Sequence, residues 1–189
     1  MGNREGVITR KVAVVVGSIR KDSINRKLAK ALVKFAPKDF ECDFVKIDDL
    51  PIFNQDHDQD PPESVRRVKA QVVASNAFLF VTPEHNRSLP TALKNVLDWV
   101  SRPYGKNLWA GKPGGLAGAS IGAVGTAVVQ AQLRGVLGYL DVPLLGQPEV
   151  YIQFTEKLID DDGNVSNDTT SKFLQTFMDR YAAWIIRFG

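Results

Sequence analysis

Apolar and polar positions follow two alternating periods along the chain. Residues 12–16 form an unbroken apolar run that stops at Gly17, as expected for a strand buried on both faces of a sheet. Apolar residues then recur at helical spacing over residues 24–35, and Pro37 ends that pattern. The chain therefore predicts a central strand followed by an amphipathic helix.

The same change of period repeats to the end of the chain. We expect further strands at 40–47, 78–81, 114–119 and 142–151, and further helices at 65–73, 90–100, 128–139 and 173–188. Acidic residues alternate with apolar ones in the first of these strands, which suits a sheet edge, and Pro143 and Pro148 interrupt the last. Ser88 is placed to cap the helix that follows it, and residues 48–62 are polar enough for a surface loop.

Strands and helices in alternation predict an α/β fold. We expect a flavodoxin-like, three-layer, doubly wound sheet of five parallel strands in the order 2-1-3-4-5, with residues 1–189 forming a single domain. Sheets of this kind bind ligands beyond the carboxyl ends of their strands. The loops that begin at Gly17, Thr82 and Ser120 therefore form the candidate site.

The first loop lacks both common nucleotide fingerprints. Residues 17–26 match neither the glycine pattern of a dinucleotide fold nor that of a P-loop. Hydroxyls at Ser18 and Ser23, the guanidinium of Arg20 and the N–H groups of a helix start suit a terminal phosphate instead. The alternative is that Asp22 or Ser23 only caps the helix while Arg20 is solvated.

Composition narrows the range of partners. The net charge of +3 is not concentrated in a basic tract, so we expect no nucleic acid. His57, His85 and the single cysteine, Cys42, lack zinc spacing, and the acidic run at 160–164 lacks that of a calcium loop, so we expect no metal. Cys42 is expected to fill the core. Without a membrane-length apolar run or an export signal, the expected location is cytoplasmic.

Several short motifs lie in order along the chain and in matching loops. They are Gly17-Ser18-Ile19-Arg20 with Ser23 and Asn25, Pro83-Glu84 with Asn86, Leu93-Lys94-Asn95 with Asp98-Trp99, and Gly111-Lys112-Pro113. In these residues the chain resembles the NADPH-dependent FMN reductase family, and within it the bacterial chromate and quinone reductases. The resemblance covers most of the chain. It implies FMN as cofactor, NADPH or NADH as electron donor, and a homodimer or homotetramer.

The resemblance also assigns roles to the loops. The FMN phosphate and ribityl end would be held by Ser18, Arg20, Ser23 and Asn25. The isoalloxazine would be flanked by Pro83, Glu84, His85, Asn86, Ser120 and Gly122. No side chain is expected to act as catalytic acid, base or nucleophile, because the cofactor carries the reaction. Hydride transfer to FMN followed by reduction of quinones or other small acceptors, chromate among them, would follow a ping-pong scheme.

Two positions in the second loop depart from the family pattern. His85 stands where the family usually has tyrosine, and Arg87 stands where it often has another aromatic residue. Titratable and cationic groups thus replace aromatic surface near the flavin. We hypothesise a preference for anionic acceptors, with Arg102 joining Arg87 in binding them.

Two other functions remain open at this point. Residues 118–122 match G-x-S-x-G between a strand and a helix, which would make Ser120 the nucleophile of a serine hydrolase. That fold needs a histidine after the serine, yet His57 and His85 both precede Ser120. A flavodoxin-type electron carrier would share the fold and cofactor, but such carriers are typically acidic, whereas this chain has 24 basic and 21 acidic residues.

Overall fold

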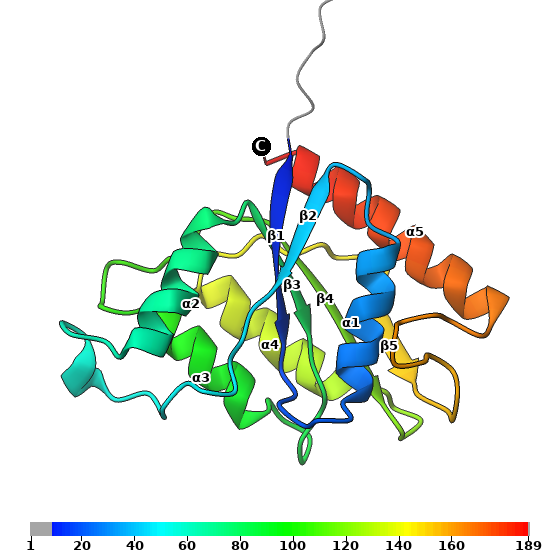
Figure 1. The fold of residues 1–189 in the computed structure, drawn as a ribbon, viewed down its shortest axis with the longest axis horizontal. Coiled ribbons are helices and arrows are strands. Elements are labelled where there is room, and N and C mark those ends of the chain that lie inside the picture. Colours follow the sequence, from blue (N-terminus) through cyan, green and yellow to red (C-terminus); the bar gives the residue numbers. More distant parts are fainter. Residues whose placement is uncertain (1–8, 189) are drawn as a thin grey trace, which may run out of the picture.

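Five parallel strands form the centre of the molecule. The computed structural model describes residues 9–188, and its sheet has the order β2-β1-β3-β4-β5 (Figure 1). The strands are β1 (Arg10–Val16), β2 (Phe40–Phe44), β3 (Ala77–Val81), β4 (Gly114–Ser120) and β5 (Val150–Gln153). Every neighbouring pair is parallel. The predicted fold class and strand order are confirmed.

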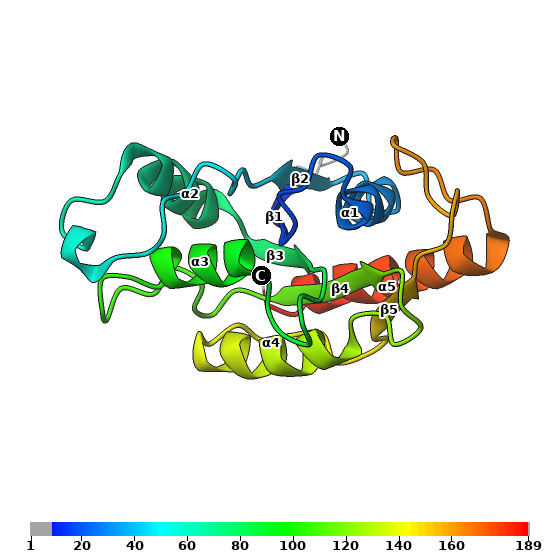
Figure 2. The same cartoon turned by 90° about the horizontal axis from the view of Figure 1, so that it is seen from below.

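Helices cover both faces of the sheet. On one face lie α1 (Ile24–Lys34) and α5 (Asp168–Ile186), and on the other α2 (Glu63–Ala74), α3 (Thr91–Val100) and α4 (Ala127–Tyr139) (Figures 1 and 2). The side chains of β1 alternate between two cores, since Val12 and Val14 pack towards α1 and α5 while Ala13 and Val15 pack towards the other three helices. This two-sided burial explains the unbroken apolar run.

The edge strand β2 is only half covered. It ends at Phe44, three residues before the predicted end, and its residues alternate between half-buried and exposed. Cys42 packs against the core beneath α1 and α5. Burial, reinforced by the charge of Asp43, raises the pKa of the Cys42 thiol to about 11. The thiol is therefore protonated at neutral pH, in agreement with a packing role.

The predicted start of the last strand and the predicted cap of α3 are also wrong. The last strand begins at Val150, and the segment before it contributes only an isolated bridge between Leu144 and Gly114. Pro143 and Pro148 carry no N–H for a ladder, which keeps that segment out of the sheet. Ser88 does not cap α3, whose N-cap position is occupied by Pro90 without any side-chain hydrogen bond.

The remaining connections match the predicted loop and turn. The loop over residues 48–62 contains a short 3-10 helix, η1 (Gln55–His57). In the acidic turn the carboxylate of Asp160 accepts the N–H groups of Asp162 and Asn164 at 3.0 and 2.8 Å. Within residues 9–188, no helix has the length and apolar character needed to span a bilayer.

Candidate functional site

A cavity of about 530 Å³ opens beyond the carboxyl ends of β1, β3 and β4. Its lining includes Ser18, Arg20, Ser23, Asn25, Pro83, Glu84, His85 and Ser120. An adjoining hollow of about 380 Å³ shares Glu84 and Ser120 and adds Asn86, Arg87 and Gly122. The structure thus brings every predicted site residue together except Arg102. The cavity lies within the size range of small-molecule and cofactor sites.

The loop after β1 leaves the sheet in close contact with α3. The N–H of Gly17 donates to the carbonyl of Val81 at 2.9 Å. A Cβ at Gly17 would lie 3.1 Å from Pro90 Cγ and 3.2 Å from Leu93 Cβ, so a larger residue would push this loop away. Glycine at this position lets the first and second loops converge on one cavity.

The first loop ends in the N-terminus of α1. Ser23 is buried and is the N-cap, and its Oγ accepts the N–H of Arg26 at 3.2 Å. Its hydroxyl hydrogen remains available to a ligand. The N–H groups of Ile24 and Asn25 precede the first intrahelical bond, as at every helix start. Capping and ligand binding are therefore compatible roles for Ser23.

Asn25 has a role that the sequence did not indicate. Its side-chain amide donates to the carbonyl of Ala119 and accepts the N–H of the same residue, both at 2.9 Å. Asn25 is 1% exposed. The two bonds fasten the start of α1 to the end of β4 and use most of the capacity of the amide. Asn25 consequently positions the first and third loops relative to each other.

The second loop has a hairpin at its tip. His85 and Ser88 exchange two backbone hydrogen bonds of 3.1 and 2.9 Å, and Asn86 and Arg87 between them have φ values of 49° and 64°. Positive φ at both central residues is typical of a type I′ turn. Gln132 of α4 holds the hairpin, donating to Arg87 O and accepting from Ser88 Oγ, both at 2.8 Å. Ser88 thus binds α4 instead of capping α3.

Glu84 joins the same loop to the start of α4. Its carboxylate accepts the N–H of Val129 at 3.1 Å and pairs with Arg87 at 3.0 Å. The Glu84 side chain is 7% exposed, whereas that of Arg87 is 66% exposed. A carboxylate is stabilised in the first turn of a helix by the N–H groups there and by the helix dipole. Val129 and Gln132 had no signal in the sequence, because both contacts span more than 40 residues.

Two cationic side chains lie at the ends of the cavity and its adjoining hollow. Arg20, exposed, donates from Nε to the carbonyl of Asp22 at 3.2 Å, which keeps its guanidinium near the first loop. Arg87, at the opposite end, is partly neutralised by Glu84. The cavity therefore suits a ligand with a strongly anionic end beside Arg20 and a flat body between the second and third loops.

Arg102 lies apart from the cavity, and the structure does not bring it together with Arg87. Its Nε and Nη2 bind Asp58 Oδ2 at 3.0 and 2.6 Å, and its guanidinium lies 6.0 Å from the ring centre of Phe53. These contacts hold the loop containing η1 against the end of α3. An arginine committed to a half-buried ion pair in this way has a structural role.

Comparison with known proteins assigns the chain to a family. The family model for NADPH-dependent FMN reductase matches residues 10–157. The chain belongs to this family. The chain is 55% identical to a 2-hydroxy-1,4-benzoquinone reductase of Burkholderia sp, over 93% of this chain and 96% of the relative. It is also 47% identical to a quinone reductase of Pseudomonas putida, over 92% and 94% of the two chains.

Among solved structures, the chain is similar to FerB, a flavoenzyme NAD(P)H:(acceptor) oxidoreductase from Paracoccus denitrificans. The TM-score is 0.91 at 45% sequence identity, covering 96% of this chain and all of FerB. A flavodoxin from Pseudomonas aeruginosa, 22% identical with a TM-score of 0.57, shares the fold. The chain is therefore an FMN-dependent enzyme with NAD(P)H as electron donor.

The donor set of the cavity fits FMN. A phosphate monoester needs positive charge and N–H or O–H donors, which the first loop offers in Arg20, Ser18, Ser23 and the start of α1. Among residues 9–188, Glu84 is the one carboxylate that lines the cavity, and it is bound to Val129 and Arg87 away from the first loop. The lining of the cavity beside the first loop therefore presents donors and the positive charge of Arg20 to an anionic group.

Proposed function

We propose that this enzyme uses FMN, bound in the cavity beyond β1, β3 and β4, to reduce quinones at the expense of NAD(P)H. The observation that carries the proposal is the convergence of three loops on one cavity that has an anion-binding end at the first loop. The high identity to a 2-hydroxy-1,4-benzoquinone reductase over nearly the whole chain supports quinones as acceptors.

In this proposal each loop contributes one part of the cofactor site. Ser18, Arg20 and Ser23 would hold the phosphate, and Asn25 would keep the phosphate loop in register with β4. The segments 83–86 and 120–122 would flank the ring system with backbone N–H groups and with Pro83. When bound, FMN supplies the chemistry by taking a hydride equivalent from NAD(P)H and passing electrons to the acceptor.

The protein's own contribution is positioning and fixed polarity. Glu84 and Gln132 lock the second loop to α4, so its N–H groups keep their direction without reorganisation during turnover. No side chain is proposed as acid, base or nucleophile. Ser120 Oγ accepts the N–H of Gly122 at 3.2 Å, and within residues 9–188 it is not hydrogen-bonded to an imidazole, which disfavours the hydrolase alternative.

The charge near the open side of the cavity favours anionic acceptors. His85 and Arg87 are both exposed at the hairpin tip, and Arg87 retains one side of its guanidinium for a ligand because only Nη1 binds Glu84. Anionic quinones, and chromate among oxyanions, would be attracted to this side. The expected acceptor class is thus negatively charged and small.

Self-association and location are further parts of the proposal. Ile121 and Val124, beside the cavity, are 79% and 48% exposed, and Tyr139 at the end of α4 is 83% exposed. Apolar surface of this kind supports a homodimer or homotetramer. Sedimentation equilibrium of the protein and of Ile121→Glu tests this self-association.

The proposed location is the cytoplasm. The protonated, half-buried thiol of Cys42 is compatible with a reducing cytoplasm.

Steady-state NADPH oxidation with free quinone and no partner protein separates an enzyme from an electron carrier. We expect sustained turnover that requires FMN, with parallel initial-velocity lines as the concentrations of NADPH and quinone are varied. Turnover only in the presence of an added redox protein would favour the carrier. Labelling of Ser120 by an organophosphate would favour the hydrolase.

A further inference from the structure

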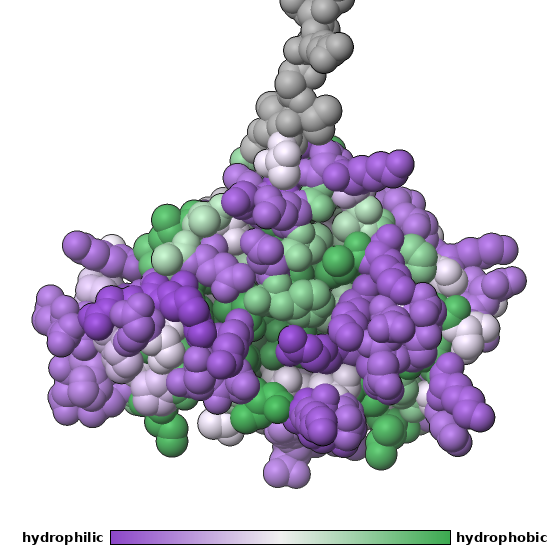
Figure 3. Space-filling model, viewed as in Figure 1, coloured by the Kyte–Doolittle hydropathy of each residue, from purple (hydrophilic) through white to green (hydrophobic). Residues whose placement is uncertain are grey.

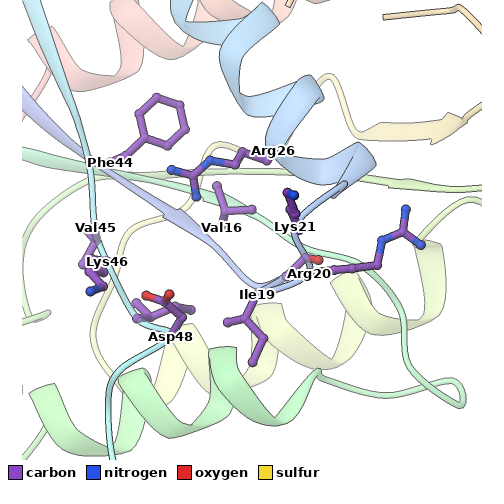
Figure 4. A pocket seen from close by; sticks show the side chains of 11 residues that line it. Val16, Ile19, Arg20, Lys21, Arg26, Phe44, Val45, Lys46 and Asp48 are labelled. Atoms are coloured by element: carbon purple, nitrogen blue, oxygen red, sulfur yellow. The ribbon is translucent and has the colours of Figure 1, made fainter. Parts of the chain in front are cut away.

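A second hollow lies on the other side of the loop that follows β1. Its volume is about 390 Å³, and it is bounded by that loop, by Arg26 of α1 and by residues 44–48 at the end of β2 (Figure 4). It shares Ser18, Ile19 and Arg20 with the cofactor cavity. A single loop therefore separates the two, and one elongated ligand can occupy both by crossing Ile19.

The side chains around this hollow are mainly cationic. Arg20, Lys21, Arg26 and Lys46 line it, against one carboxylate, that of Asp48. Lys46 pairs with Asp49 at 3.4 Å, and Arg20 extends away from the other three cations in Figure 4. Over residues 9–188, no carboxylate lies within ion-pair distance of Lys21 or Arg26. The hollow thus has an excess of positive charge.

Arg26 is held by an aromatic ring and not by an acid. Its guanidinium carbon lies 5.5 Å from the ring centre of Phe44, and Figure 4 shows the side chain reaching from α1 towards that ring. A guanidinium stacked in this way keeps its N–H fork for an oxyanion, and the fork matches phosphate. Its exposed position on the first turn of α1 adds to the positive potential there.

The base of the hollow is apolar. Val16, Val45 and Ile47 line it and are buried, and Phe44 forms one wall. In Figure 3 apolar surface is recessed between strongly hydrophilic side chains on the side where β2 lies in front. A ligand that fits this hollow therefore combines a phosphate with a flat or apolar group, as a nucleotide does.

We infer that this hollow binds the adenosine end of NADPH through its 2′-phosphate, while the nicotinamide end enters the cofactor cavity across Ile19. This inference rests on the proposed function, in which FMN already occupies the donors at Ser18 and Ser23. NADPH is then the reactant that brings a second phosphate monoester to the site. The 2′-phosphate meets Arg26, Lys21 and Lys46, so the enzyme discriminates NADPH from NADH.

Calorimetric titration of the FMN-loaded protein tests the inference without turnover. The probes are 2′,5′-ADP, which carries the 2′-phosphate, 5′-AMP, which lacks it, and inorganic phosphate. We expect 2′,5′-ADP to bind about tenfold or more tightly than 5′-AMP, since charge-assisted bonds to a phosphate are lost in the latter. The difference should shrink at high salt, because exposed charges are screened.

A double variant assigns the effect to the hollow. Arg26→Gln with Lys46→Gln should remove the preference for 2′,5′-ADP and raise the KM for NADPH about tenfold more than the KM for NADH. The N-cap bond of Ser23 uses the backbone N–H of residue 26, so α1 keeps its start in this variant. Lys34→Gln with Lys38→Gln makes the same change of charge at the far end of α1 and should leave the preference intact.

Three results would overturn the inference. They are equal binding of 2′,5′-ADP and 5′-AMP, an unchanged preference in the double variant, and binding of inorganic phosphate as tight as that of 2′,5′-ADP, which would indicate a general anion site. Failure of the proposed function is recognised separately, because the protein would then hold no FMN. If FMN is bound and reduced by NADPH without discrimination between the two probes, only this inference fails.

Discussion

Replacing Asn25 tests whether the cavity depends on the link between α1 and β4. In Asn25→Leu the N–H and the carbonyl of Ala119 lose their partners in a place where Asn25 is 1% exposed. Each buried polar group left without a partner costs about 1–3 kcal/mol. Two such groups predict that the free energy of unfolding falls by about 2–6 kcal/mol. Asn25→Asp, which retains only the acceptor, should also destabilise the fold.

The loss should extend to cofactor binding. The first turn of α1 carries N–H groups that would bind the phosphate, and the side chain of Asn25 ties this turn to Ala119 at the end of β4. We therefore expect FMN to bind about tenfold more weakly to either Asn25 variant. Urea unfolding should be followed on the flavin-free protein, because a ligand that binds only the native state would mask the intrinsic change. Flavin fluorescence quenching gives the affinity.

Asn95 offers a matched control. Its amide accepts the N–H of Phe53 at 2.7 Å and donates to the carbonyl of Pro51 at 2.9 Å, which repeats the pattern of Asn25 away from the cofactor cavity. The carbonyl of Pro51 also accepts from Trp99, so Asn95→Leu leaves it partnered and should cost about 1 kcal/mol. FMN affinity should not change. Equal losses of stability in both leucine variants, or normal binding of FMN by Asn25→Leu, would show that the link between α1 and β4 does not support the cavity.

Three further changes probe other parts of the structure. Gly118→Ala should lower the free energy of unfolding by about 2 kcal/mol or more in chemical denaturation, because its Cβ would lie 2.5 Å from the carbonyl oxygen of Thr82. An unchanged free energy of unfolding would contradict the close packing of Gly118 against Thr82. Arg87→Ala should lower the ratio of turnover with an anionic quinone to turnover with a neutral one. An unchanged ratio would show that Arg87 does not select anionic acceptors. Alkylation of Cys42 should be slow at pH 7 and rise as the pH passes through about 11, since burial raises its pKa to that value; fast labelling at pH 7 would show an exposed thiolate.

The sequence was informative where local pattern decides structure. The unbroken run of β1 and the helical spacing from Ile24 predicted the first two elements, because the period of burial follows directly from strand and helix geometry. The convergence of three loops followed from the strand order alone. The resemblance of the short motifs to those of the family then predicted FMN as the cofactor.

The sequence was uninformative where a side chain chooses a distant partner. Asn25 binds Ala119, 94 positions away, and Arg102 binds Asp58, 44 positions away. Serine often caps helices, yet the hydroxyl of Ser88 donates a hydrogen bond to Gln132 of α4. Residues of this kind look the same in sequence whether they face a ligand or another part of the chain. Only the packed structure separates positioning residues from ligand-binding ones.

The most direct test of the central claim is the visible absorbance spectrum of the purified protein, recorded before and after anaerobic addition of NADPH. We expect the two absorption bands of oxidised flavin, their loss on addition of NADPH, and their return when a quinone is added. A colourless protein that also fails to bind added FMN would contradict the account, as would bound flavin that NADPH leaves oxidised.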